Sequence, residues 1–121
     1  MKRSSKHRTE RLAALIREAI ADVLSTQIKD PRIGFVTVTG VTVSADISHA
    51  TVRISVLGTD IEKESAMEGL KHARGFVRTY LARRLDLRTA PELHFILDRG
   101  LEHASRIDSI LDEIRREEPG S

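Results

Sequence analysis

The sequence has no cysteine and no tryptophan, and aromatic residues make up only 3% of it. Without cysteine the chain forms no disulfide and no thiolate metal site, which fits a reducing cytoplasm. Long hydrophobic runs are also missing, because the first run begins at Leu12 and is broken at Arg17. A secretory signal or a membrane span needs a longer uncharged run. We therefore expect a soluble, cytoplasmic protein with no membrane contact.

Common catalytic patterns are missing as well. The chain contains neither G-x-S-x-G, nor a phosphate-binding loop ending in Gly-Lys-Ser/Thr, nor an H-E-x-x-H pair. The five histidines are scattered along the sequence, and His94 fits a partly exposed strand residue better than a catalytic group. We expect no enzymatic activity, no metal site and no cofactor.

The length of the chain limits its organisation. Its 121 residues suffice for one two-layer core but not for two independent cores. We predict a single domain over residues 1–121, with a basic N-terminal segment at 1–8 and a frayed tail at 115–121. We also expect a monomer.

The net charge is only +2, but two segments of the sequence are strongly basic. Residues 1–11 contain five Lys or Arg and one Glu, and residues 71–88 contain six Lys or Arg and one Asp. The remainder of the chain is acidic. Either block alone could equally be a solvated surface, but the two together favour binding to a nucleic acid.

Apolar residues at helical spacing predict the helices. One stripe runs from Leu12 to Ile28 and stops at Asp30-Pro31, since proline cannot continue a helix and its predecessor avoids the helical region. A second helical stretch covers residues 61–85, and a third follows Asp98.

Alternation of apolar and polar residues predicts three strands, at 35–43, 50–56 and 93–97. The alternation changes phase within the first strand, so we predict a bulge near Thr39-Gly40. The short connection at 44–48 suits a hairpin. The order α-β-β-α-α-β-α predicts an α+β fold with the helices on one face of a three-stranded sheet.

The segment Ala73-Arg74-Gly75 interrupts the second helical stretch. Glycine inside a helix costs about 1 kcal/mol relative to alanine. Because the apolar stripe continues across this segment, we predict two helices that meet at a kink rather than at a loop. Lys71, Arg74 and Arg78 share roughly 60° of the helix surface. Two compatible interpretations are that Gly75 lets a phosphate approach the backbone, or that Ala73 and Gly75 are small for tight packing on the sheet.

The composition also restricts how RNA could be bound. A stacking platform needs exposed rings, and Phe95 shares the phase of the buried side of its strand. A helix-turn-helix reader needs amide side chains, whereas this chain has no Asn and a single Gln. Recognition of the RNA backbone remains, with a protein-interaction module as the alternative. The candidate RNA-binding residues are Lys71, Arg74, Gly75, Arg78, Arg83, Arg84, Arg3, Lys6, Arg8 and Arg11.

Three segments carry a resemblance to a known family. They are Lys29-Asp30-Pro31-Arg32-Ile33-Gly34-Phe35-Val36-Thr37-Val38-Thr39, Val43-Ser44-Ala45-Asp46-Ile47-Ser48-His49-Ala50, and Ala73-Arg74-Gly75 before a helix. In this order they closely resemble bacterial ribosome-binding factor A, over residues 6–108. The resemblance implies a type II KH-like fold in which an Ala-x-Gly kink replaces the usual Gly-x-x-Gly loop.

The same resemblance implies a function. Family members bind the free small (30S) ribosomal subunit and its 16S rRNA late in assembly. They assist maturation of the 5′ end of the rRNA and growth in the cold. We accordingly expect a non-catalytic RNA-binding protein of ribosome biogenesis.

Overall fold

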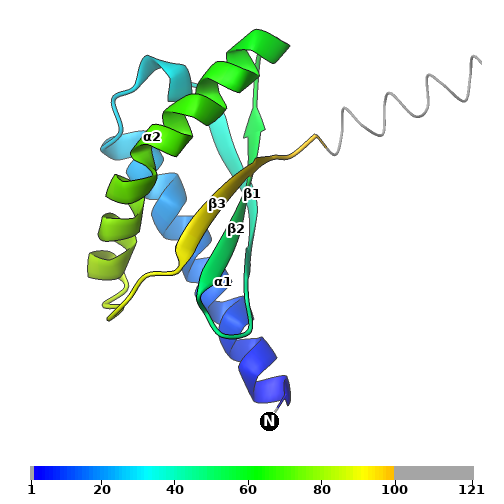
Figure 1. Cartoon of the computed structure of the whole chain (residues 1–121), viewed down its shortest axis with the longest axis vertical. Helices are drawn as coiled ribbons and strands as arrows, with labels where there is room; N and C mark the ends of the chain where they lie inside the picture. The colour runs from blue at the N-terminus through cyan, green and yellow to red at the C-terminus, as the bar shows by residue number, and fades with distance from the viewer. Residues whose placement is uncertain (1, 100–121) are drawn as a thin grey trace, which may run out of the picture.

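A computed structural model describes residues 2–99, and Figure 1 shows two long helices packed against a small sheet. In chain order the elements are α1 (Lys2–Thr26), the 3-10 helix η1 (Pro31–Ile33), β1 (Val36–Val43), β2 (His49–Val56), α2 (Asp60–Arg84) and β3 (Glu92–Leu97). The predicted α+β class and the three strands are confirmed. The predicted last helix and the tail at 115–121 lie outside the described residues.

The sheet has the order β1-β2-β3, with β1 and β2 antiparallel and β3 parallel to β2. α2 forms the crossover that a parallel pair requires. The register passes from Val38↔Ile54 to Gly40↔Arg53, which leaves Thr39 as the extra residue of a bulge. The predicted bulge is therefore confirmed. A Cβ at Gly40 would meet the guanidinium of Arg53, the flexible end of that side chain, which would have to move aside.

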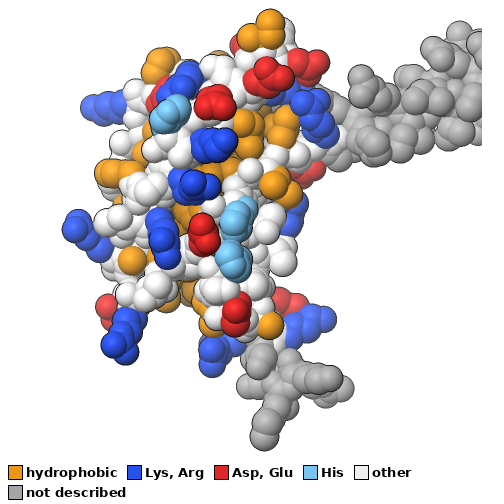
Figure 2. Space-filling view, in the orientation of Figure 1, with side chains coloured by type: hydrophobic (Ala, Val, Ile, Leu, Met, Phe, Trp, Pro, Cys, Tyr) orange, Lys and Arg blue, Asp and Glu red, His pale blue; other side chains and the backbone are white. Residues whose placement is uncertain are grey.

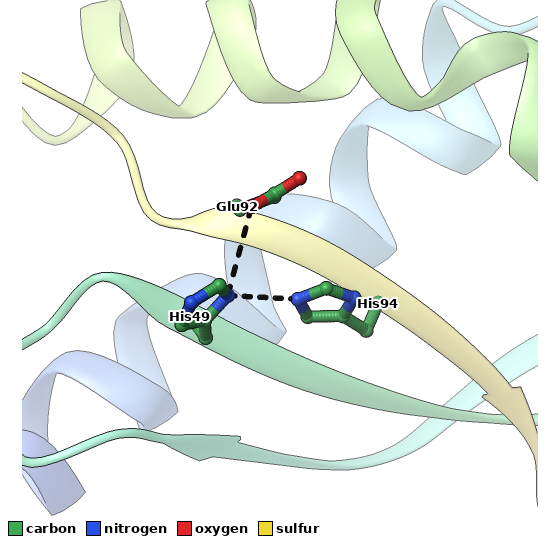
Figure 3. A group of neighbouring side chains, drawn as sticks. All are labelled: His49, Glu92 and His94. Carbon is green, nitrogen blue, oxygen red and sulfur yellow. Dashed lines mark hydrogen bonds and ion pairs between the residues drawn. The ribbon is translucent and has the colours of Figure 1, made fainter.

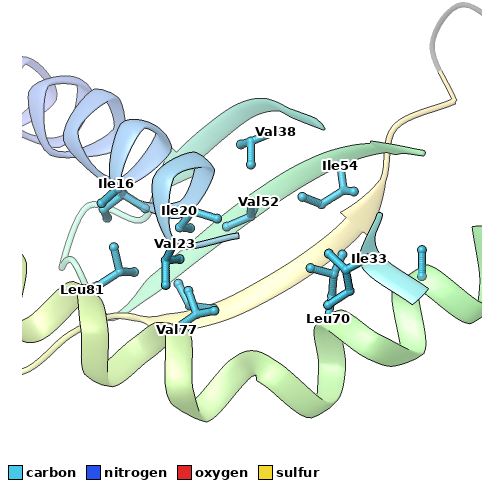
Figure 4. Packing of buried hydrophobic residues seen from close by; sticks show 14 of the residues in the cluster. Ile16, Ile20, Val23, Ile33, Val38, Val52, Ile54, Leu70, Val77 and Leu81 are labelled. Atoms are coloured by element: carbon cyan, nitrogen blue, oxygen red, sulfur yellow. The ribbon is translucent and has the colours of Figure 1, made fainter. Parts of the chain in front are cut away.

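A single apolar core joins the helices to one face of the sheet (Figure 4). Alternate residues of β2 point into this core, so its other residues lie on the opposite, open face. The buried side chains come from all layers, and they include Ile16, Ile20, Val23, Ile33, Val38, Val52, Ile54, Leu70, Val77 and Leu81. Fully burying one such side chain stabilises the fold by about 1.5–3 kcal/mol.

The second helix starts with a capping box. The Oγ1 of Thr59 accepts a hydrogen bond from the Glu62 N–H, and the Glu62 carboxylate accepts one from the Thr59 N–H. The hydrogen bond from the Thr59 N–H to the carboxylate lowers the pKa of Glu62. The two bonds of the capping box satisfy two of the N–H groups that a helix start leaves without partners.

α2 is one unbroken helix from Asp60 to Arg84, so Ala73-Arg74-Gly75 lies inside it. The predicted absence of a loop is confirmed, but the predicted division into two helices is not observed. Burial of Leu70 and Val77 on either side outweighs the cost of one glycine. A bend of the axis stays a prediction. It is supported by the Thr79 hydroxyl, which donates to the Gly75 carbonyl at 3.1 Å, a bond type that often bends helices.

Gly69, rather than Gly75, is the glycine of α2 that lies closely packed against another element. A Cβ on Gly69 would lie 3.0 Å from Cγ1 of Ile33 and 3.3 Å from Cβ of Arg32, both in η1. A Cβ on Gly75 would have no neighbour within 4 Å. The structure therefore rejects tight packing as the reason for Gly75.

Asp30 holds η1 in shape beneath α2. Its Oδ1 accepts from the Arg32 N–H at 2.9 Å, and its Oδ2 pairs with the Arg32 Nη2 at 2.6 Å. These contacts hold the pKa of Asp30 at about 2. The Lys29–Gly34 segment is thus built to dock the turn on α2 at Gly69.

The β1–β2 turn is held by a second aspartate. Oδ1 of Asp46 accepts from the Ser44 hydroxyl at 2.8 Å and from the Ser48 hydroxyl at 2.6 Å. These bonds lower the pKa of Asp46 to about 2, with Ser48 the largest cause. Ser44 Oγ in turn accepts from the His49 N–H at 3.0 Å, so the turn fixes the first residue of β2.

The two glycines of α2 should respond oppositely to added side chains. Gly75→Ala should raise the free energy of unfolding by about 0.5–1 kcal/mol, since it meets no neighbour and improves helix propensity. Gly69→Val should lower it by about 1–3 kcal/mol through overpacking against Ile33. Urea denaturation measures both, and a destabilised Gly75→Ala variant would contradict the open environment of that position.

The Asp46 network should make stability pH-dependent. Because the folded pKa lies below the ordinary value of 3.8, its contribution is present above about pH 4 and is lost as the pH falls toward 2. Asp46→Asn should therefore lower the melting temperature at pH 6 and show a smaller deficit near pH 2. A deficit that is constant from pH 6 to pH 2 would assign the effect to lost hydrogen bonds alone.

Candidate nucleic-acid interface

A groove of about 400 Å³ separates α2 from the edge strand β3. Its lining comes from both elements: Met67, Glu68, Lys71, Arg74, His94, Phe95 and Ile96. Figure 2 shows Lys and Arg side chains over α2, beside two adjacent His side chains over the sheet. The groove therefore brings the predicted basic face of α2 next to an exposed sheet edge.

Lys71 and Arg74 are the basic residues of this groove. Both side chains are exposed, and neither has a hydrogen bond or an ion pair within residues 2–99. Among the described residues, Glu68 is the one carboxylate in the lining, and it partly offsets the positive charge. Gly75 lies four residues after Lys71, on the neighbouring part of the same helix face. The helix thus offers two cations beside an open stretch of backbone.

Arg78 has a structural contact instead. Its Nε and Nη2 both donate to the carbonyl oxygen of Ala90, at 3.2 and 3.0 Å. Ala90 lies in the connection that leads from α2 to β3. Arg78 therefore fixes the distance between the two walls of the groove.

Arg84 is also engaged within the fold. Its Nη1 lies 2.5 Å from Oδ2 of Asp22 in α1 and 2.9 Å from the Tyr80 hydroxyl, and its Nη2 lies 3.9 Å from Glu18. The contacts with Tyr80 and Asp22 raise the pKa of Arg84. This guanidinium ties α1 to α2, whereas Arg83 beside it is exposed and has no polar partner in the described part of the chain.

The N-terminal basic block is helical. α1 begins at Lys2, although the apolar stripe that predicted this helix begins only at Leu12. Lys6, Arg8 and Arg11 are exposed on its first turns, and the helix also contains Arg3, of whose side chain nothing is described. In Figure 1 these turns project past the hairpin end of the sheet, apart from α2. The structure therefore separates the two basic blocks into two patches.

Sequence reasoning missed one group of side chains. The histidines that look scattered in the sequence include two neighbours, because the β2–β3 register places His49 beside Glu92 and His94. His94 is exposed on its strand as expected. The sequence shows that Glu92 and His94 lie on the same face of one strand, because they are two residues apart. Their proximity to His49 depends on the register between two parallel strands, which the sequence does not show.

Within residues 2–99, neither α1 nor α2 is apolar over a stretch long enough to cross a bilayer.

Comparison with protein families gives one clear match. A family model described as Ribosome-binding factor A matches residues 8–111. The Ribosome-binding factor A of Syntrophomonas wolfei is 46% identical over 119 residues, which cover 97% of this chain and 98% of that protein. The Ribosome-binding factor A of Desulforamulus reducens is 47% identical over 112 residues, or 93% of each chain.

Solved structures are similar in fold. The crystal structure of ribosome-binding factor A from Thermus thermophilus has a TM-score of 0.69 at 29% identity, over 76% of this chain and 97% of that one. A homology model of the Thermus thermophilus factor, fitted into a cryo-EM map of a 30S complex, has a TM-score of 0.62 at 30% identity. That match covers 72% of this chain and 91% of the other. The predicted KH-like α+β fold is thereby confirmed.

Substitution of the two neighbouring arginines at the end of α2 should distinguish a residue that stabilises the fold from one that only lies on its surface. Arg84→Ala should lower the melting temperature, because it removes the contacts with Asp22 and Tyr80. Arg83→Ala should change the free energy of unfolding by no more than about 0.5 kcal/mol. Thermal unfolding followed by circular dichroism compares them, and equal losses would refute the division.

Proposed function

The chain belongs to the ribosome-binding factor A family, and on that premise we propose that it binds the free 30S subunit through its 16S rRNA. It assists late maturation of the subunit, including processing of the 5′ end of the rRNA. The observation that carries the RNA-binding part is the pair of exposed cations, Lys71 and Arg74, in the groove beside β3, which have no polar partner among residues 2–99. The Thermus thermophilus factor fitted into a 30S complex supports the choice of partner.

Recognition in the groove acts on the RNA backbone. Lys71 and Arg74 are one turn apart, so they can contact neighbouring phosphates. The open surface at Gly75 allows a phosphate close to the helix backbone. Arg83 and the exposed cations Lys6, Arg8 and Arg11 add phosphate contacts outside the groove. Arg78 and Arg84 support the interface indirectly, by holding α2 against its neighbours.

A non-catalytic role fits this arrangement. Acid–base cleavage of RNA needs a general acid and a general base within reach of one phosphate. In the part of the chain that the structure describes, the groove lining offers Glu68 and His94 on opposite walls, among apolar and cationic neighbours. We propose that the protein assists maturation by binding and not by cleaving the RNA itself.

A protein-interaction module is the second candidate, and one surface favours it. Phe35, Leu57 and Ile61 are 73%, 76% and 79% exposed, and they line a depression of about 390 Å³ near the start of α2. Exposed apolar clusters of this kind often mark protein contacts. Titration with naked 16S rRNA separates the candidates, because a protein-docking module would bind whole subunits but not the RNA.

Charge reversal in the groove should weaken binding. Arg74→Glu and Lys71→Glu should each lower the affinity for 30S subunits and for 16S rRNA, while leaving the melting temperature near that of the unchanged protein. The matched control is Arg17→Glu, which makes the same charge change at an exposed position of α1. If the groove variants bind normally and Arg8→Glu does not, the interface lies on the N-terminal patch.

Salt dependence gives a second readout of the same interface. If about five phosphates are neutralised, the logarithm of the affinity should fall with the logarithm of the salt concentration, with a slope near −3.5 to −4.5. Arg74→Glu should reduce the magnitude of this slope by about 1. A salt-independent affinity would contradict backbone recognition.

A further inference from the structure

Three potential metal ligands meet on the open face of the sheet, where β2 and β3 begin (Figure 3). His49 is the register partner of Glu92 across the parallel ladder, and His94 follows Glu92 by two residues on the same face. The side chains come from two adjacent strands, so their Cβ positions are fixed by the ladder hydrogen bonds. Their nearest ligand atoms all lie within 4.8 Å of one another.

The distances suit a tetrahedral ion. Nδ1 of His49 lies 2.9 Å from Nε2 of His94 and 3.7 Å from Oε2 of Glu92. Two ligand atoms that bind one tetrahedral ion at about 2.0–2.1 Å are about 3.3–3.4 Å apart. The two observed distances lie on either side of this value, and the third pair, His94 and Glu92, lies within 4.8 Å. Side-chain rotations would gather the three ligand atoms around one ion.

The scaffold beneath the ligands is firmly held. The backbone N–H of His49 donates to Ser44 Oγ at 3.0 Å, and that hydroxyl donates to the Asp46 carboxylate. The backbone N–H of Glu92 donates to the Ser48 carbonyl at 2.9 Å. The turn therefore fixes both strand starts, which lowers the entropic cost of collecting the ligands around an ion.

We propose that His49, Glu92 and His94 bind a divalent transition-metal ion, with Zn²⁺ the best match. Two imidazoles and one carboxylate form a ligand set that zinc uses in proteins, with water in the fourth position. Imidazole ligands argue against Mg²⁺ and Ca²⁺, which prefer oxygen. The proposal departs from the expectation of no metal site, which rested on the absence of cysteine and on the spacing of the histidines in the sequence.

The metal would lie at the rim of the basic groove. His94 belongs to the groove lining together with Lys71 and Arg74. A bound ion would add positive charge at the β3 wall, opposite the cations of α2. The metal site is nevertheless independent of the proposed RNA binding, since it depends only on the three ligands.

Calorimetric titration of the untagged full chain with zinc chloride tests the site. We expect one ion per chain, with affinity that falls on acidification because protons compete for the imidazole nitrogens. His49→Ala and His94→Ala should each weaken binding by at least about 10- to 100-fold, the loss typical of removing even an outer-shell partner. His72→Ala is the matched control, as an exposed histidine on α2 whose ring bonds the Glu68 carbonyl instead.

A second measurement guards against misfolded variants. Zinc should raise the melting temperature of the unchanged protein and of His72→Ala, but not of His94→Ala, whose melting temperature without metal should be near normal. In NMR spectra the ring signals of His49 and His94 should shift together on zinc addition. No zinc binding, or binding unaffected by the His49 and His94 variants, would overturn the proposal, as would an equal loss in His72→Ala.

Discussion

The packing of α2 across the sheet is the constraint on which the rest of the structure depends. Leu70, Val77 and Leu81 are fully buried on one side of this helix, and they span the segment where glycine would favour an interruption. Each buried side chain contributes about 1.5–3 kcal/mol, whereas Gly75 costs about 1 kcal/mol. The helix therefore continues, and its outward side carries Lys71 and Arg74 in one rigid element along the edge strand.

Four basic residues of α2 divide into two groups because they face different surroundings. Arg78 faces the connection to β3, where it bonds the Ala90 carbonyl, and Arg84 faces α1, where it pairs with Asp22. Lys71 and Arg74 face solvent above the groove. The first group holds the helix in position, and the second is available to a polyanion. Counting charges along the sequence cannot distinguish these duties, since all four residues belong to one basic block.

Sequence reasoning succeeded where a local pattern decides the structure. The phase change between Val38 and Val41 located the bulge, whereas the first helix ends at Thr26, earlier than the stop predicted at Asp30-Pro31. It failed where a distant partner decides. The contrast between Gly69 and Gly75 depends on which helix face meets η1, and the meeting of His49 with His94 depends on strand register. Neither is encoded in spacing along one element.

The separation of the two basic patches limits which RNA could contact both of them at once. Arg84 ties α2 to α1 through Asp22, and the buried stripe of α1 ties it to the sheet, so the two helices that carry the patches are held in one fold. Such a fold gains from two-point binding only if its partner presents phosphates at the matching separation. A flexible single strand must lose entropy to do so, whereas a folded RNA presents them in advance. On the proposed function, the pair of patches therefore favours structured RNA over single strands, independently of base sequence.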